Sequence, residues 1–519
     1  PNTVLRELEH VLDALDSFDE DPAGFLQVCK AIGVKPIVNL FWRDLPYMHI
    51  HCSITPDTLH QLYQGVIKHI ISWITKACGA TEIDARCHHM PPNHNIQSFM
   101  KGISMLSRVT GQEHDRMCRV LLGLVIDIPL PGGLLNVQLI RAVRSLLDFV
   151  YLARYPVHTD EMLELLEDAL ACFHDVKDVF VNLGIRNLFN IPKLHSMRHY
   201  AMFIRLYGTT DNFDTAYTER LHIDFVKDAY AATNHKDEFT QMATWLEHKE
   251  KMFHHEQYIK WQDSSSSYSH CVRCRCSIVP MVQQFPYSPR WGTTHLSVAM
   301  FYGATYFRPA LAHFIALAND PGLSRAQLEA KLRSVCMPFR TVPVWHRIKY
   351  LRKDPVSNSI MTANSIHVRP STTDSHGRSV PGRFDTALVN EGTGGDTGVE
   401  GYRVGRMQVV FSIPEKACNI TFSRGVVVPQ HLAYIEWNTP FSNPPDHSHL
   451  LYKISPLRDQ NGGHICSIIP LVKIRRSIHL LPKFGPTAPQ EWTSSNVLDL
   501  CSSFYVNCFT DGHLYRILC

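Results

Sequence analysis

The sequence predicts a multidomain protein of the α+β class. Apolar residues recur at helical spacing through most of the first 262 residues. A serine run, "QDSSSSYSH" (262–270), then marks a linker. After residue 400, short β-branched and aromatic runs are separated by Pro, Gly and Asn, which is typical of a small β barrel or sandwich.

The composition is that of a folded protein. The 519 residues are 45% hydrophobic and 19% charged, which excludes wholesale disorder. No apolar run approaches the about 20 residues that span a bilayer, and the acidic, amphipathic first stretch is not a signal peptide. The 15 Cys, mostly single residues within apolar runs, are typical of reduced thiols. We expect a protein of the nucleus, or of the cytoplasm before import, that is not secreted and has no membrane partner.

Residues 1–79 are expected to form the first unit. Apolar and acidic positions alternate at helical spacing over 1–30, which predicts an amphipathic helix or a pair of helices. "MHIHCSI" (48–54) suits a strand, which Pro56 and Asp57 would end. "TLHQLYQGVIKHIISWITKA" (58–77) has an apolar stripe that predicts a helix directly after Asp57.

A helical bundle is expected over residues 80–190. Four helical runs separated by proline-marked breaks predict it: "SFMKGISMLSRV", "HDRMCRVLLGLVI", "NVQLIRAVRSLLDFVYLARY" and "DEMLELLEDALACFHDV". A second helical part, 191–262, contains a long helix over about 215–260. We then expect a linker and helical connector at 263–353, a flexible linker at 354–400 and a β-rich, barrel-like module at 401–519.

Charge is unevenly distributed along the chain. Residues 270–519 hold 26 Lys and Arg against 15 Asp and Glu, whereas the whole chain holds 51 against 48. The acidic N-terminal half is therefore joined to a basic C-terminal half, which hints at a polyanion partner. Basic side chains there could contact phosphates while neighbouring aromatics stack on bases, although an ordinary surface and core would show the same composition. The candidate DNA-binding residues are Arg403, Arg406, Lys473, Arg475 and Arg476.

Asp57 has two alternative roles. Asp is a favoured helix N-cap, because its carboxylate accepts the free N–H groups of the first turn. A carboxylate at the carboxyl end of a strand can instead face the crevice in which ligands bind to α/β sheets. A metal site for phosphate chemistry would need at least one more carboxylate.

Glu219 is the best candidate for that second carboxylate. It shares one broad helix face with His222 and Lys227, although ordinary solvated residues would show the same spacing. "NIPKLHSMRHY" (190–200) places two histidines one helical turn apart, a candidate zinc pair without an evident third ligand. The supporting site residues are His60, His222, Lys227, His195 and His199.

A second candidate zinc site follows the serine run. "HCVRCRC" (270–276) offers His270, Cys271, Cys274 and Cys276, but no partner CxxC exists in the chain, so a half-site or reactive thiols are alternatives. There is no P-loop, no Rossmann glycine fingerprint, no Gly-x-Ser-x-Gly elbow and no HExxH. ATPase, dehydrogenase, serine hydrolase and zincin functions are therefore disfavoured.

Several long stretches, taken in order, resemble one family. They are "LFWRDLPYMHIHCSITPDTLHQLYQGVIKHIISWI", "HHMPPNHNIQSFMKGISMLSRVTGQEHDRMCRVLLGLVI", "NIPKLHSMRHY" and "YGTTDNFDTAYTERLHIDFVKDAYAATNHKDEFTQM". Over roughly residues 35–262 the chain resembles the Plavaka transposases, which belong to the Kyakuja–Dileera–Zisupton group of DNA transposons abundant in mushroom-forming fungi. "VGRMQVVFSIP" and "SIIPLVKIRRSIHLLPKFG" resemble the β-rich tail of such proteins.

The resemblance implies a ribonuclease-H-type core, a mixed sheet that carries three acids in the DDE pattern. Two divalent ions on such acids activate water or a DNA 3′-hydroxyl for attack on a phosphodiester. Mg²⁺ or Mn²⁺ would be the cofactor, because carboxylate and phosphate oxygens suit these ions. The family pattern places the second acid at Asp57 and the third at Glu219, with residues 80–190 as a helical insertion between them.

The first acid of the pattern has no clear counterpart. Asp44 lies in the loop-like "WRDLPY", and the chain begins at Pro1 without a Met. The resemblance therefore implies an N-terminally truncated, incomplete core, which is expected to bind metal poorly and to be inactive as this fragment. The partners would be the DNA of transposon ends and further copies of the chain. The alternative function is non-catalytic DNA or chromatin binding through the basic β module.

Overall fold

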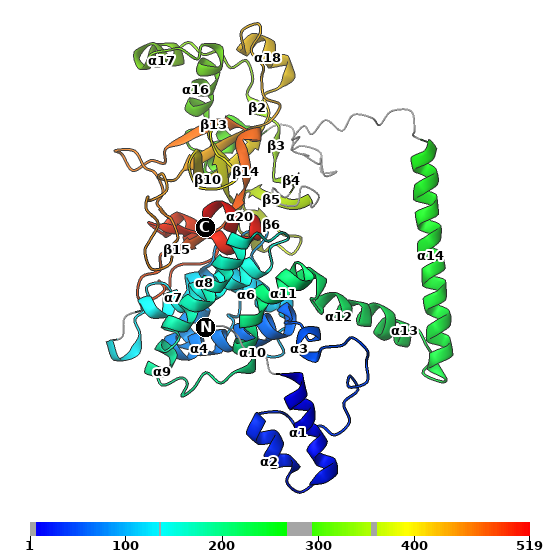
Figure 1. The fold of residues 1–519 in the computed structure, drawn as a ribbon. Helices are drawn as coiled ribbons and strands as arrows, with labels where there is room; N and C mark the ends of the chain where they lie inside the picture. The colour runs from blue at the N-terminus through cyan, green and yellow to red at the C-terminus, as the bar shows by residue number, and fades with distance from the viewer. Residues whose placement is uncertain (1–6, 134–135, 267–292, 354–360) are drawn as a thin grey trace.

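The computed structural model describes residues 7–133, 136–266, 293–353 and 361–519. Helices dominate the N-terminal half and antiparallel sheets the C-terminal half (Figure 1). The multidomain α+β prediction is confirmed at this level.

A small helical hairpin comes first. Helices α1 (Leu8–Glu20) and α2 (Phe25–Ile32) pack through a core of their own, in which Val11 and Leu15 meet Phe25 and Cys29. The hairpin lies apart from the main body at the bottom of Figure 1. The amphipathic pair predicted over 1–30 is thus present.

The helical body follows. Its core gathers the apolar faces predicted from the 3.6-residue period, and α6, α7 and α8 coincide with three of the four predicted runs. Its elements are α3 (Ile50–Ser53), η1 (Thr58–Ile67), α4 (Lys68–Cys78), α5 (Ala80–His89), α6 (Gly111–Val125), η2 (Pro131–Gly133), α7 (Val137–Ala153), α8 (Asp160–Val176), α9 (Val179–Asn182), α10 (Pro192–Ser196), η3 (Met197–His199) and α11 (Tyr200–Tyr207).

Two predictions within this body are wrong. The expected strand at 48–54 is the short helix α3. The remaining predicted helical run, "SFMKGISMLSRV" (98–109), consists of turns and loop. Between residues 7 and 266, the part of the chain that the structure describes contains a single isolated β-bridge and no strand. Asp57 therefore follows no strand, and the mixed sheet of a ribonuclease-H-type core is not confirmed.

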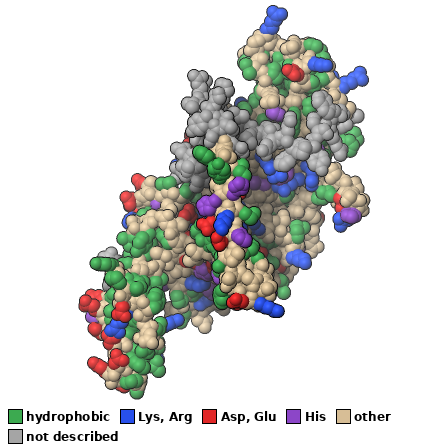
Figure 2. All heavy atoms as spheres, turned by 90° about the vertical axis from the view of Figure 1, so that its right-hand side faces the viewer, with side chains coloured by type: hydrophobic (Ala, Val, Ile, Leu, Met, Phe, Trp, Pro, Cys, Tyr) green, Lys and Arg blue, Asp and Glu red, His purple; other side chains and the backbone are tan. Residues whose placement is uncertain are grey.

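An arm of helices projects from the body. It comprises α12 (Ala216–His222), η5 (Ile223–Lys227), α13 (Asp228–Ala231) and α14 (Glu238–Ser266), so that the long helix predicted over 215–260 is broken at 232–237. Helix α14 stands away from the body at the right of Figure 1. Figure 2 shows the molecule with this right-hand side of Figure 1 toward the viewer. On that face, acidic, basic, histidine and hydrophobic side chains are interspersed.

The C-terminal half is a set of antiparallel sheets capped by helices. The main sheet has the order β13-β11-β10-β9-β14, and β3 also pairs with β10; smaller sheets are β4-β5-β8, β12-β16-β15, β6-β7 and β1-β2. The strands are β1 (Thr293–Thr294), β2 (Thr341–Val342), β3 (Val344–Trp345), β4 (Arg347–Lys353), β5 (Met361–Arg369), β6 (Thr372–Thr373), β7 (Ser379–Val380), β8 (Arg383–Phe384), β9 (Thr386–Asn390), β10 (Tyr402–Phe411), β11 (Leu432–Trp437), β12 (Lys453–Ile454), β13 (Cys466–Pro470), β14 (Ile474–Ile478), β15 (Leu480–Pro482) and β16 (Phe504–Val506). The helices are α15 (His295–Tyr302), α16 (Phe307–Asn319), α17 (Arg325–Leu332), α18 (Glu415–Thr421), η6 (Leu471–Lys473), α19 (Val497–Leu500), η7 (Cys508–Thr510) and α20 (Gly512–Leu518).

The flexible linker predicted over 354–400 is wrong between 361 and 390. Strands β5 to β9 occupy this stretch, and β9 lies inside the main sheet, between β10 and β14. The β-rich region therefore begins well before residue 401.

The helical body and the C-terminal segments share one hydrophobic core. Leu481 of β15 packs so closely on α6 that a Cβ at Gly123 would lie 2.7 Å from its Cδ2 atom. The fully buried Arg86 of α5 donates to the carbonyl of Ile126 and, at 2.6 Å, to that of Gly485. The last strands and helices are thus part of the body (Figure 1). No helix among the described residues is long and apolar enough to cross a membrane.

Candidate functional site

Asp57 caps the helix that follows it. Its backbone is extended, and its carboxylate accepts the N–H of Leu59 at 3.1 Å and that of His60 at 2.9 Å. The capping alternative is therefore realised, as expected for Asp before an apolar-periodic run. Asp57 is nevertheless 8% exposed, which is unusual for a cap that only faces solvent.

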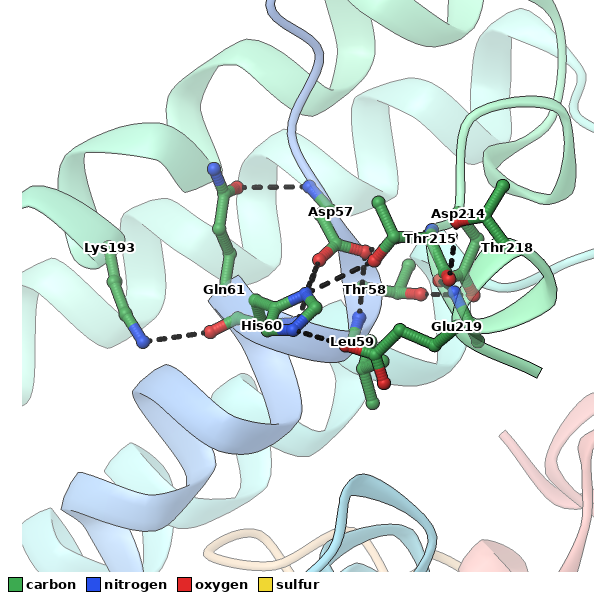
Figure 3. A network of polar contacts seen from close by, with 11 residues as sticks. Asp57, Thr58, Leu59, His60, Gln61, Lys193, Asp214, Thr215, Thr218 and Glu219 are labelled. Atoms are coloured by element: carbon green, nitrogen blue, oxygen red, sulfur yellow. Dashed lines mark hydrogen bonds and ion pairs between the residues drawn. The ribbon is translucent and has the colours of Figure 1, made fainter. Parts of the chain in front are cut away.

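The ring of His60 joins Asp57 to Glu219. Nδ1 lies 2.5 Å from Oδ2 of Asp57, and Nε2 lies 2.7 Å from Oε1 of Glu219 (Figure 3). The two ring nitrogens therefore face two different carboxylates. The structure thus brings together three of the predicted residues from two distant parts of the chain, with an imidazole between the two acids.

Three further residues of this network escaped the sequence analysis. Oγ1 of Thr58 donates to Asp214 at 2.5 Å, and the N–H of Thr215 donates to Asp57 at 3.3 Å. Asp214 also accepts the N–H of Ala216 at the start of α12. An Asp directly before a predicted helix is a capping signal, and that signal in "NFDTAY" could have indicated Asp214.

The surroundings favour the ionised form of Asp57. Burial alone would raise the pKa of its carboxyl, but hydrogen bonds from His60 and Thr215 outweigh burial and lower it. Close by, burial and then the charges of Asp57 and Asp214 raise the pKa of Tyr200 far above its usual value. The buried Tyr200 hydroxyl has no hydrogen-bond partner among the described residues.

The donor set fits a divalent ion only when the His60 ring turns away. A carboxylate has about four lone-pair sites, and the two oxygens of Asp57 already accept from Leu59, Thr215 and twice from His60. Only the ring bond can be released by a side-chain rotation that leaves the helix cap intact. In the present geometry, no group of three or more His, Cys, Asp or Glu within the described residues is arranged to hold a metal ion.

The other supporting residues lie outside this network. His222 and Lys227 are exposed on α12 and η5. His195 and His199 face each other near the surface, with their Nε2 atoms 3.3 Å apart. Burial, and then the neighbouring charges of His195 and Arg198, lowers the pKa of His199.

Most of the candidate DNA-binding side chains are engaged within the protein. Arg406 pairs with Asp499, and Arg475 pairs with Asp396 at 2.9 Å. The other two arginines are also paired, Arg403 with Glu391 and the buried Arg476 with Asp511. Lys473 is exposed on η6. Four of the five side chains are therefore already paired with acids of the same chain.

The candidate zinc ligands His270, Cys271, Cys274 and Cys276 lie outside the described residues. Their role stays a prediction.

Residues 1–74 match the family model described as Plavaka transposase. This match confirms the resemblance to Plavaka transposases over the segment, whereas the fungal origin and the wider transposon group stay predictions. The matched residues include Asp57 and His60, while Asp214 and Glu219 lie beyond them. Searches of curated proteins and of solved structures found no match.

Proposed function

We propose that this transposase-derived chain carries a DDE-type site in which Asp57 and Glu219 are two of the metal-binding acids. The observation that supports it is the His60 bridge, because one imidazole holds two carboxylates that the family pattern assigns to the same site. Asp214 supplies a third carboxylate within the same network. The proposal rests on this geometry and on the Plavaka match, since the described residues contribute no sheet beneath the site.

The bound cofactor would be Mg²⁺ or Mn²⁺, held by Asp57 and Glu219. Such an ion polarises a phosphodiester oxygen and activates water. The chain's own residues do the rest: the cap fixes Asp57 at the start of η1, Thr215 orients one of its oxygens, and the His60 ring lies between the two acids until it turns away.

The arrangement with His60 between the acids is an inactive state. The ring contacts one oxygen of each carboxylate, so these oxygens are not free to bind a cation while it stays there. The substrate would be transposon-end DNA, met in the nucleus by more than one copy of the chain.

The alternative, DNA or chromatin binding through the basic β module, has less support. Four of its five candidate residues are arginines that already form ion pairs with acids of the same chain. A guanidinium that is already paired gains little from a phosphate, because one anion only replaces another.

Mn²⁺ binding tests the proposal. Electron paramagnetic resonance of free Mn²⁺ is expected to show weak binding to the unaltered protein, and at least tenfold tighter binding to His60→Ala, which removes the competing ring. The double variants His60→Ala/Asp57→Asn and His60→Ala/Glu219→Gln should lose this gain. The matched control His248→Ala, an exposed histidine of α14, should bind as the unaltered protein does.

Equal Mn²⁺ affinity in the unaltered protein and in His60→Ala would overturn the metal assignment. A gain that survives Asp57→Asn or Glu219→Gln would do so too, because the ion would then bind elsewhere. The unaltered protein should not nick a supercoiled plasmid in Mn²⁺, and nicking would refute the inactive state.

A further inference from the structure

A second polar cavity lies away from the Asp57 site, between the helical body and the C-terminal helix. It measures about 210 Å³ and opens between α6, α7 and α20. Its charged lining comprises Asp115, Arg119, Arg154, Asp511 and Arg516. No part of the proposed metal site uses these residues.

Both carboxylates of the cavity are paired with arginines. Asp115 accepts from Arg119, from Arg154 at 2.7 Å and from the hydroxyl of Tyr63 at 2.8 Å. Although burial would raise the pKa of Asp115, these charges and hydrogen bonds lower it, so the group is ionised. The first wall of the cavity is therefore an ion network in which two arginines surround one carboxylate.

Asp511 is equally occupied. Its Oδ2 accepts from Arg476 and from Asn95 at 3.0 Å, and its Oδ1 accepts the N–H of Leu514 at 3.0 Å. The negative charge of Asp511 is thus balanced by Arg476, which is not among the residues that line the cavity.

Two N–H donors of the lining arginines, in contrast, have no acceptor among the residues that the structure describes. Within the described part of the chain, Nη1 of Arg516 and Nε of Arg119 are buried atoms without a hydrogen-bond partner. Arg516 takes part in no ion pair there either. Buried donors without an acceptor cost free energy, and the two side chains that carry them line this cavity.

The size of the cavity restricts the occupant. Cavities that take drug-sized ligands measure about 300–1,000 Å³, so 210 Å³ suits a smaller group. Planar guanidinium forks match the oxygens of phosphate and carboxylate, and a tetrahedral oxyanion offers acceptors in several directions at once. Tyr151 and Tyr155 also line the cavity.

We propose that this cavity binds a phosphate-class oxyanion through Arg516 and Arg119. The group is either free inorganic phosphate or the terminal phosphate of a DNA end. This inference does not depend on the metal site, because the two places share no residue.

Isothermal titration calorimetry with inorganic phosphate, at ionic strength held constant with chloride, tests the proposal. The unaltered protein is expected to bind with one site per chain, and Arg516→Gln to weaken binding at least tenfold. Arg516→Lys keeps the charge but lacks the fork, and should retain part of the affinity. The control Arg325→Gln, a change at an exposed arginine of α17, should bind as the unaltered protein does.

A second titration separates the sources. DNA duplexes that carry a 5′-phosphate or a 5′-hydroxyl are compared, and a preference for the 5′-phosphate that Arg516→Gln abolishes identifies the DNA end. Binding of neither probe, or binding that Arg516→Gln leaves unchanged while circular dichroism shows an intact fold, would overturn the proposal and leave a water-filled cavity. The Mn²⁺ titration is unaffected by either result.

Discussion

At the scale of single residues, Asp57 combines two roles that the sequence presented as alternatives. It caps η1 with both oxygens, and the same oxygens contact the ring of His60 and the backbone of Thr215. The cap was predictable, because Asp before an apolar-periodic run is a local signal. The contact of Asp57 with Thr215 and that of His60 with Glu219 were not predictable from local sequence, since they depend on how η1 packs against a segment about 158 residues away.

Substitutions at Asp57 should separate the cap from the charge. Asp57→Ala removes the cap and should cost about 1–2 kcal/mol of unfolding free energy, whereas Asp57→Asn keeps one capping oxygen and should cost less. Because the folded protein lowers the pKa of Asp57, the charge stabilises the fold above the unfolded pKa of about 4. That part is lost progressively as the pH falls from this value through the lowered pKa of the folded protein.

Urea unfolding at pH 6 and pH 3 measures both effects. The difference between the unaltered protein and Asp57→Asn should shrink at pH 3, while Asp57→Ala remains less stable than Asp57→Asn. A difference that is the same at both pH values would mean that the carboxylate charge contributes nothing to folding.

At the scale of elements, the period of the apolar residues predicted helices correctly where one face of the helix is buried. It did not predict strands in which polar side chains are buried. Helix α8 has the bounds of its predicted run, because its apolar stripe faces the shared core. Strands β5 to β9 were missed since their polar residues suggest a loop. Asn364 and Asp385 are in fact buried and hydrogen-bonded: Asn364 accepts the N–H of Ser477, and Asp385 that of His367. Such partners are invisible in a single sequence.

Helix α14 should be the least stable long helix of the molecule. It stands away from the body (Figure 1), and its surface pairs Glu247–Lys251 and Glu256–Lys260 contribute only about 0.2–0.5 kcal/mol each. Its amides should exchange with deuterium at least about a hundredfold faster than those of the buried helix α6. Equal protection of α14 and α6 would show that α14 is covered by a partner in solution.

At the scale of the whole molecule, the shared core makes the two halves unfold together. Arg86 donates to acceptors of both halves: to Glu82 and the Leu124 and Ile126 carbonyls in the helical body, and to the Gly485 carbonyl. Arg86→Ala removes these hydrogen bonds and the ion-pair partner of Glu82, and should lower the unfolding free energy by about 3–5 kcal/mol. The control Arg220→Ala, at an exposed pair, should change it by about 0–1 kcal/mol.

Scanning calorimetry with far-ultraviolet circular dichroism reports the result. One transition, displaced to lower temperature in Arg86→Ala, is expected from a single core. Two separate transitions would show that the helical body and the C-terminal strands are independent.

The shared core also sets the order of events during synthesis. The helical body contributes residues 62–204 to it, but Leu480, Phe504 and Leu518 complete it. Ribosomes add about 5–20 residues per second, so the helices wait roughly 15–60 s for the roughly 300 residues that close their apolar faces. During that interval the nascent chain exposes an apolar surface of the kind that chaperones bind. A ribosome that stalls late releases a polypeptide that cannot bury this surface.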